Sequence, residues 1–209
     1  MKNLIKFICL VVMMQSCISQ TKTKETIRQV GGPCEGCEAL LEYGDKSLKN
    51  TDTVLGFSDN TPQLKLTGTV YHNDGKTPAE DIIIYAYQTN RAGIYTPSKN
   101  ASGWERRHGK HRTWLRTDKD GKYTIFTFRP GSYPNRLEPE HIHITVKEPN
   151  TNAYYIDDFV FDDDPLLTPQ RRQQLRNRCG SGISKPQLKD GILTTERDLI
   201  LGLNIPDYE

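Results

Sequence analysis

Short segments in which hydrophobic and polar residues alternate recur along the chain, and turn-forming residues separate them. Alternation with a period of two predicts strands with one buried face, and many such segments between turns favour an antiparallel sandwich. The lysine, aspartate and glycine at 119–121 lie between two of these segments and predict a tight hairpin. The expected strands are residues 64–71, 81–88, 112–117, 122–128, 141–147, 153–161 and 193–201.

Helical patterns are rare in this sequence. The best candidate is residues 168–178, where Thr168 suits the N-cap and Pro169 the first helical position. We therefore expect an all-β fold, an antiparallel β-sandwich with few short helices. A chain of 209 residues is long enough for one such domain with a substantial core.

The N-terminus resembles an export signal. Lys2 and Lys6 precede an apolar run of eight residues at 7–14, which is too short to span a bilayer. Ser16-Cys17 follows, as at a bacterial lipoprotein cleavage site, although Gln15 is an unusual neighbour. The pattern predicts a signal peptide over 1–17 with Cys17 lipidated. An ordinary cleaved signal and an uncleaved N-terminus are the alternatives.

The domain organisation follows from this signal. Residues 18–33 are polar and predict a flexible tether, and residues 34–209 form the predicted folded domain. The expected location is the cell envelope, periplasmic or associated with the outer membrane. The protein would be anchored by lipid rather than spanning the membrane.

Cysteine usage agrees with export. Cys34, Cys37 and Cys179 remain after the signal, and an oxidising compartment favours one disulfide and one spare thiol. The pairing among the three is open. The Cys-x-x-Cys spacing also suits zinc or redox chemistry, but no further ligands cluster nearby and the βαβ pattern of a redox motif is absent.

The charge balance excludes one class of partner. The formal net charge is +2 at pH 7, so bulk charge gives no argument for nucleic-acid binding. The basic run at 106–112 is interpreted as a solvated loop; the alternative is a basic rim of the pocket that attracts an acidic aromatic substrate. The aspartates around 157–164 lack the spacing of a calcium loop and suggest a turn.

Two histidines and two tyrosines are the candidate metal ligands. His141 and His143 lie two apart in an expected strand, so both side chains leave the same face. Tyr133 lies in a turn made rigid by Pro130, Gly131 and Pro134, and Tyr95 follows another strand. A polar outer strand face and tyrosines bonded to backbone are the alternatives. Phenolate oxygen requires a strongly charged Lewis acid, so two tyrosinates with two imidazoles point to Fe(III).

The ordered motifs resemble one family. The segments GIY at 93–95, WLRTDKDGKYTIFTFRPGSYP at 114–134 and HIHITV at 141–146 resemble the intradiol ring-cleavage dioxygenases, a family that includes the protocatechuate and catechol enzymes. LTGTV at 66–70 and IIIYAYQTN at 82–90 also look like that family, so the resemblance covers roughly residues 62–165.

The resemblance implies ligands and a reaction. Tyr95, Tyr133, His141 and His143 match the family's iron ligands, and Tyr133 matches the tyrosinate that leaves the metal when substrate binds. The implied cofactor is Fe(III), and the implied substrates are a small-molecule catechol and O2. The implied product is a muconic-type diacid, made by cleaving the bond between the two hydroxylated carbons.

The chain departs from the family pattern at one position. Glu138 stands where members commonly carry an arginine that stabilises substrate charge, and Arg136 or Arg129 are the candidates to replace it. Arg136 is therefore predicted as a catalytic residue together with Tyr133. The long helical N-terminal segment of the catechol enzymes is absent, so any homo-oligomer must form differently.

Two other functions compete with this one. His141, His143 and Glu148 have the spacing of a cupin site for divalent iron, but that interpretation leaves both tyrosines unexplained. Residues 66–87 also resemble transthyretin-like sandwiches that act as non-catalytic binding modules. Such a module would have no use for four metal ligands.

Overall fold

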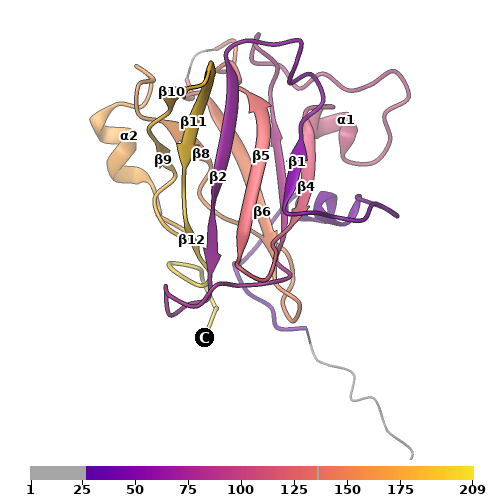
Figure 1. The fold of residues 1–209 in the computed structure, drawn as a ribbon, viewed down its shortest axis with the longest axis vertical. Coiled ribbons are helices and arrows are strands. Elements are labelled where there is room, and N and C mark those ends of the chain that lie inside the picture. The colour runs from indigo at the N-terminus through magenta and orange to yellow at the C-terminus, as the bar shows by residue number, and fades with distance from the viewer. Residues whose placement is uncertain (1–26, 136) are drawn as a thin grey trace, which may run out of the picture.

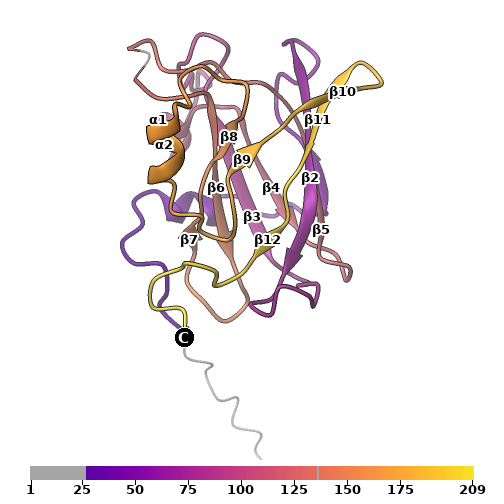
Figure 2. The ribbon, with the colours of Figure 1, turned by 90° about the vertical axis from the view of Figure 1, so that its left-hand side faces the viewer.

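The protein is a sandwich of two six-stranded sheets in the computed structural model, which describes residues 27–135 and 137–209. Figure 2 shows the two sheets as separate layers, with the helices outside the layer that contains β6. The predicted signal segment 1–17, most of the predicted tether and Arg136 lie outside the described residues.

The first sheet is built around β2 (Gln63–Tyr71), which pairs with β5 (Lys122–Phe128) in antiparallel register. Its order is β1-β5-β2-β11-β10, with β12 also paired to β2 (Figure 1). The remaining strands are β1 (Thr51–Thr53), β10 (Gln187–Lys189), β11 (Ile192–Glu196) and β12 (Leu199–Ile200).

The second sheet carries the candidate ligands. Its order is β4-β3-β6-β8-β9, with β7 also paired to β6. Strand β3 lies between β4 and β6, and Tyr87 of β3 pairs with His143 of β6. The strands are β3 (Ile83–Gln88), β4 (Arg112–Arg116), β6 (His141–Lys147), β7 (Tyr154–Tyr155), β8 (Phe159–Phe161) and β9 (Ile183–Ser184).

The alternation along β6 separates core from site. Ile142, Ile144 and Val146 point inward and join the main core between the sheets, where each is nearly inaccessible to solvent. His141 and His143 therefore leave the outer face of the second sheet. One strand thus contributes to the core with one face and to the candidate site with the other.

The outer face of the second sheet is covered by short helices and loops. The 3-10 helix η1 (Cys37–Leu41) packs there in a smaller apolar cluster with Tyr85 and Trp114. Two α-helices, α1 (Glu105–His108) and α2 (Pro169–Gln174), lie on opposite sides of the molecule in Figure 1. Among the described residues, neither helix has the length and hydrophobicity needed to cross a bilayer.

The expected all-β sandwich is confirmed, and so is the helix at Thr168, whose side chain caps it by accepting from the Arg171 amide. The helix ends at Gln174, earlier than predicted. The sheets are mixed rather than purely antiparallel, since the pairs β1–β5, β2–β11, β2–β12 and β8–β9 are parallel.

The predicted hairpin at 112–128 is wrong. Strand β4 pairs with β3 in the second sheet, whereas β5 pairs with β1 and β2 in the first. The turn between them still forms, because Asp118 accepts from the Asp120 and Lys122 amides and Gly121 adopts a positive φ of 67°. A tight turn reverses the direction of the chain but does not require the two flanking strands to pair. Here the chain passes from the second sheet to the first at the turn.

Residues at the end of the predicted tether contact the domain. The Arg28 amide donates to the Asn150 carbonyl, and the Gly31 amide donates to the Pro206 carbonyl. Val30 is buried in the main core. Ordered structure therefore begins before the predicted boundary at Cys34.

The cysteine pairing that the sequence left open is resolved in the structure. Cys34 and Cys37 form a disulfide with Cα atoms 5.6 Å apart, and Cys179 is a buried free thiol. The disulfide lies at the start of η1, on the same sheet face as the candidate ligands.

Candidate metal centre

Four donor atoms converge on the outer face of the second sheet. The Tyr95 and Tyr133 hydroxyl oxygens lie 2.8 Å apart, and the Tyr133 oxygen lies 3.2 Å from His141 Nε2. His141 Nε2 lies 3.1 Å from His143 Nε2, which in turn lies 2.8 Å from the Tyr95 oxygen. The four residues predicted as ligands thus form a closed ring of donor atoms.

The two histidines come from one strand, and the two tyrosines come from two loops that meet. Gly93 and Gly131 allow this approach. A Cβ atom on Gly93, whose φ is 76°, would lie 1.9 Å from the Ser132 carbonyl oxygen. A Cβ atom on Gly131 would lie 2.5 Å from the Arg91 carbonyl oxygen. Only glycine permits this backbone contact, which places Tyr95 beside Tyr133.

The donor set fits ferric iron. Two donors that each lie about 2.1 Å from an ion and subtend a right angle are about 3 Å apart, close to the separations around this ring. Phenol oxygens and imidazole nitrogens together suit a hard, highly charged ion that accepts both donor types. The residues present are therefore able to hold Fe(III).

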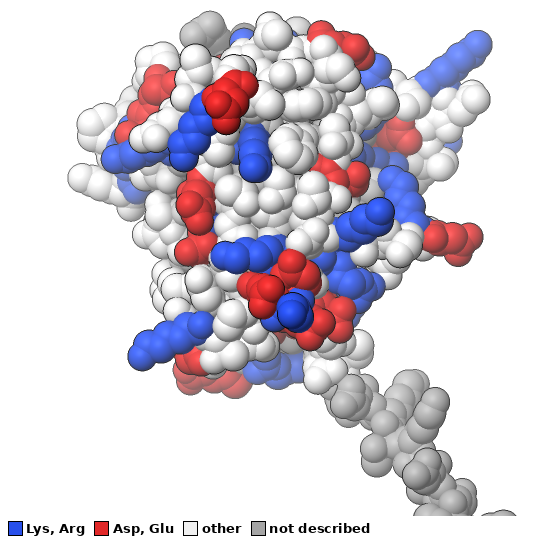
Figure 3. Space-filling model, viewed as in Figure 1, with Lys and Arg blue, Asp and Glu red and all other residues white. Residues whose placement is uncertain are grey.

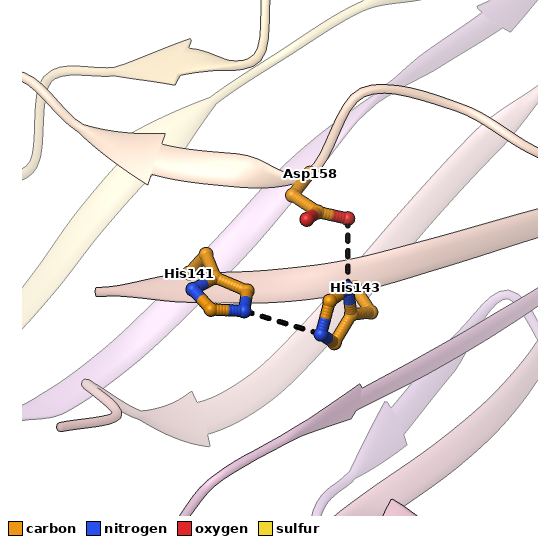
Figure 4. A group of neighbouring side chains, drawn as sticks. All are labelled: His141, His143 and Asp158. Carbon is orange, nitrogen blue, oxygen red and sulfur yellow. Dashed lines mark hydrogen bonds and ion pairs between the residues drawn. The ribbon is translucent and has the colours of Figure 1, made fainter. Parts of the chain in front are cut away.

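The second nitrogen of each histidine has its own partner. His141 Nδ1 lies 2.7 Å from the Pro139 carbonyl oxygen, so it carries the proton and donates. His143 Nδ1 lies 3.1 Å from Asp158 Oδ1 (Figure 4). Such partners fix the tautomer and orientation of metal-binding imidazoles. Both Nε2 atoms are thereby left to face the tyrosine hydroxyls.

Asp158 supports the ring of donors rather than belonging to it. His141, His143 and Asp158 form a compact group of possible ligands among the described residues. However, the Asp158 carboxylate contacts the nitrogen of His143 that points away from His141 (Figure 4). The tyrosine oxygens, and not this carboxylate, lie at hydrogen-bond distance from the Nε2 atoms.

Burial sets the protonation preferences of these groups. Burial raises the pKa of Tyr95, and the neighbouring Tyr133 raises it further. Burial also raises the pKa of Tyr133. Burial and the adjacent His143 lower the pKa of His141, which favours a neutral imidazole with a lone pair to donate. Ionising both phenols at this site requires a strongly positive partner, as expected for a metal centre.

An aromatic stack packs against the His143 ring. The Tyr87 ring lies 4.5 Å from the His143 ring and 3.9 Å from the buried His108 ring. His108 is held by the Tyr85 hydroxyl, 2.9 Å from its Nδ1. The basic run at 106–112 is thus only partly a solvated loop, because His108 packs beneath the site. Trp104 and Trp114 pack in this layer and line none of the cleft described next.

A cleft of about 410 Å³ opens beside the donor atoms. Tyr133, His141 and His143 border it, whereas Tyr95 does not. Arg171 and Arg176, from α2 and the segment after it, form the opposite wall. Its volume is within the range of small-molecule sites.

Arg129, one of the two arginines named from the sequence, does not line this cleft. Arg129 faces away, paired with Glu140 at 2.5 Å and Asp163 at 2.8 Å, so it is wrong as a replacement for the missing charge. Arg136 lies outside the described residues, and its predicted role stays a prediction. Glu138 borders the cleft and pairs with Arg171 at 2.9 Å.

The competing cupin centre is not assembled. Glu148 accepts hydrogen bonds from the Tyr154 and Tyr208 hydroxyls, at 2.7 and 2.8 Å, and is not grouped with the histidines.

Positive and negative side chains are mixed over the face shown in Figure 3, as expected from the small net charge.

Known proteins resemble this chain in sequence. The protocatechuate 3,4-dioxygenase beta chain of Burkholderia cepacia is 28% identical over 152 residues, which are 69% of this chain and 63% of that protein. The chain therefore spans slightly less than two thirds of that relative's length. No family profile matches the chain.

Solved structures resemble it in fold. Catechol 1,2-dioxygenase from Acinetobacter sp. ADP1 superposes with a TM-score of 0.55 at 20% identity, covering 73% of this chain and 56% of that one. The fold is that of catechol 1,2-dioxygenase. Hydroxyquinol 1,2-dioxygenase from Pseudomonas putida DLL-E4 gives 0.55 at 18% identity, covering 87% of this chain and 68% of its own.

A smaller relative shares almost its whole length with this fold. The dioxygenase domain of a dioxygenase and carbohydrate-binding protein fusion from Streptomyces sp. SirexAA-E gives a TM-score of 0.54 at 18% identity, covering 75% of this chain and 90% of that one. Together these similarities confirm the resemblance to the intradiol dioxygenases that the motifs predicted.

Asp158, Tyr87, Arg171 and Arg176 belong to the site or its cleft and were not identified from the sequence. Asp158 lies in a break between β7 and β8, within residues predicted as one continuous strand. Tyr87 is one of several aromatic residues in a strong strand, and Arg171 comes from a helix 33 residues after Glu138. Only the outward position of Tyr87, opposite His143, could have been inferred from alternation.

Proposed function

We propose that this protein is a non-haem Fe(III)-dependent intradiol dioxygenase that cleaves the ring of a catechol with O2 to give a muconic-type diacid. The observation that carries the proposal is the ring of two phenol oxygens and two imidazole nitrogens, with neighbours 2.8 to 3.2 Å apart. The similarity to a protocatechuate dioxygenase and to catechol 1,2-dioxygenases supports the same reaction class.

The four ligands have different environments and therefore different roles. His141, His143 and Tyr95 would hold the ion, since the histidines are fixed by Pro139 and Asp158 and Tyr95 lies away from the cleft. Tyr133 borders the cleft, so as a metal-bound phenolate it would be placed to move aside for a substrate oxygen and to accept a proton from it. A bound ferric ion would supply Lewis acidity that draws the catechol in as its dianion and makes the ring reactive toward O2.

The surrounding residues prepare the site for this chemistry. The outer strand face, the stacked Tyr87 and the Asp158 carboxylate hold His143 in one orientation. The cleft has the volume of a small-molecule site and borders Tyr133, whereas Tyr95 lies outside its lining. From residues 1–17 we further propose that the protein is exported and lipid-anchored at the cell envelope.

Iron content and visible absorption test the proposal. Protein lacking residues 1–17 is loaded with ferric iron, and we expect about one iron per chain and a tyrosinate-to-iron absorption band that shifts when catechol is added without O2. Tyr95→Phe and Tyr133→Phe should each change the band and abolish O2 consumption, because each removes one phenolate. Tyr71→Phe, which alters a phenol at the end of β2, is the matched control and should behave as wild type.

The outcomes separate the competing functions. A colourless protein that takes up no ferric iron contradicts the proposal and leaves the non-catalytic binding sandwich. An iron protein whose band is the same in Tyr95→Phe and Tyr133→Phe contradicts the assigned ligands.

A further inference from the structure

The wall of the cleft opposite the metal ligands is unusually basic. It is formed by α2 and the residues that follow, which present Arg171 and Arg176 toward the space beside Tyr133. These guanidinium groups come from a part of the chain that supplies none of the four candidate ligands. The two arginines differ in their hydrogen-bond partners, and these partners decide which guanidinium is free to bind a ligand.

Arg171 is already neutralised. Its Nη1 donates to the Glu138 carboxylate at 2.9 Å, and its Nη2 donates to the Leu137 carbonyl oxygen. The pair ties α2 to the loop that leads into β6. Arg171 therefore shapes the wall, while Glu138 cancels its charge.

Arg176 has no such partner. Its one described hydrogen bond is donated by Nη1 to the Tyr155 hydroxyl at 3.3 Å, and within residues 27–135 and 137–209 it forms no ion pair. The other acids of the cleft are engaged elsewhere. Asp157 accepts from the Asn177 and Arg178 amides, and Asp158 contacts His143.

We infer that Arg176 is a specificity-determining residue that selects catechols carrying an anionic substituent, with the Tyr155 hydroxyl holding it at the cleft. The inference rests on the proposed function, because the catechol hydroxyls are taken to lie at the ring of ligands. The substituent then extends across the cleft toward α2.

The charges of the cleft support this orientation. Asp158 beside His143 makes the metal side unfavourable for a further free anion, and Arg171 cancels the charge of Glu138. The Asp157 carboxylate is occupied by the Asn177 and Arg178 amides. An anionic substituent is therefore favoured at the α2 side, where Arg176 donates charge-assisted hydrogen bonds. Because Arg176 is exposed, the preference should weaken as salt concentration rises.

The test compares a carboxylated catechol with a neutral one. We expect wild type to prefer 3,4-dihydroxybenzoate over catechol in kcat/KM, and Arg176→Gln to reduce that preference about tenfold, the scale of one hydrogen bond to a charged group. Glu138→Gln should increase the preference for 3,4-dihydroxybenzoate, because the substitution leaves the positive charge of Arg171 uncompensated. Arg106→Gln, an exposed arginine on α1 that lines none of the cleft, is the matched control.

A binding measurement separates this inference from the proposed function. Calorimetry with 4-hydroxybenzoate and phenol, which lack adjacent hydroxyls to be cleaved, reports the preference for the anion without turnover. If wild type prefers 4-hydroxybenzoate over phenol and Arg176→Gln loses this preference, the inference is supported. If in addition no catechol is cleaved, only the proposed function fails. Equal binding of the two ligands by wild type, or an unchanged preference in Arg176→Gln, overturns the inference.

Discussion

At the scale of single residues, the site depends on which nitrogen of each histidine faces the tyrosines. A carbonyl oxygen fixes His141, and a carboxylate fixes His143. A carboxylate hydrogen-bonded to an imidazole also raises its basicity as a ligand. Asp158 therefore affects both the orientation of His143 and its strength as a donor.

Substitution of Asp158 should weaken metal binding in a graded manner. Asp158→Asn keeps an acceptor but removes the charge, so we expect about a tenfold loss of iron affinity; Asp158→Ala removes both, and the loss should approach a hundredfold. Competition with a chelator measures the affinity. The exposed Asp59→Asn serves as the control, and equal iron affinity in Asp158→Ala and wild type would exclude the supporting role.

At the scale of elements, the site forms where two loops meet one strand. The strand face could be predicted, because His141 and His143 alternate with the buried Ile142 and Ile144. The meeting of the loops could be proposed only by resemblance, since Tyr95 and Tyr133 are 38 residues apart. Gly93 and Gly131 are the physical reason that the two loops approach so closely.

A methyl group at Gly93 should separate the tyrosines. In Gly93→Ala the new Cβ would overlap the Ser132 carbonyl, so the loops must move apart and iron binding should be lost from a protein that still folds. Gly75→Ala is the matched control, because its φ of 66° is similar but its Cβ would meet Ile200 only at 3.5 Å. The control should lose about 1 kcal/mol of stability from backbone strain alone and keep its iron. Equal iron content in the two folded variants would show that the close approach is not required.

The same scale explains what the sequence could not reveal. The turn at 119–121 was identified correctly, but no local signal shows that β4 and β5 belong to different sheets. Hydrogen bonding to β3 and β2 decides that, and both partners lie earlier in the chain. Arg171 was missed for a related reason, because its partnership with Glu138 depends on how α2 packs against the loop before β6.

At the scale of the whole molecule, structure and chemistry are divided between the two faces of one sheet. The inner face of the second sheet packs against the first sheet in the main core, while its outer face carries the four donors, the aromatic stack and the cleft. The two histidines are therefore attached to the sheet, and the two loops place the tyrosines over it, without interrupting the core. This division lets the chain gather polar side chains that the core could not accommodate.

The products made from catechol under ¹⁸O2 test the central claim most directly. We expect iron-loaded protein to convert catechol to muconic acid carrying two ¹⁸O atoms, because cleavage falls between the hydroxylated carbons and both oxygen atoms are incorporated. A ring-opened aldehyde, which marks cleavage outside the two hydroxyls, or intact catechol after incubation with fully loaded protein would contradict it.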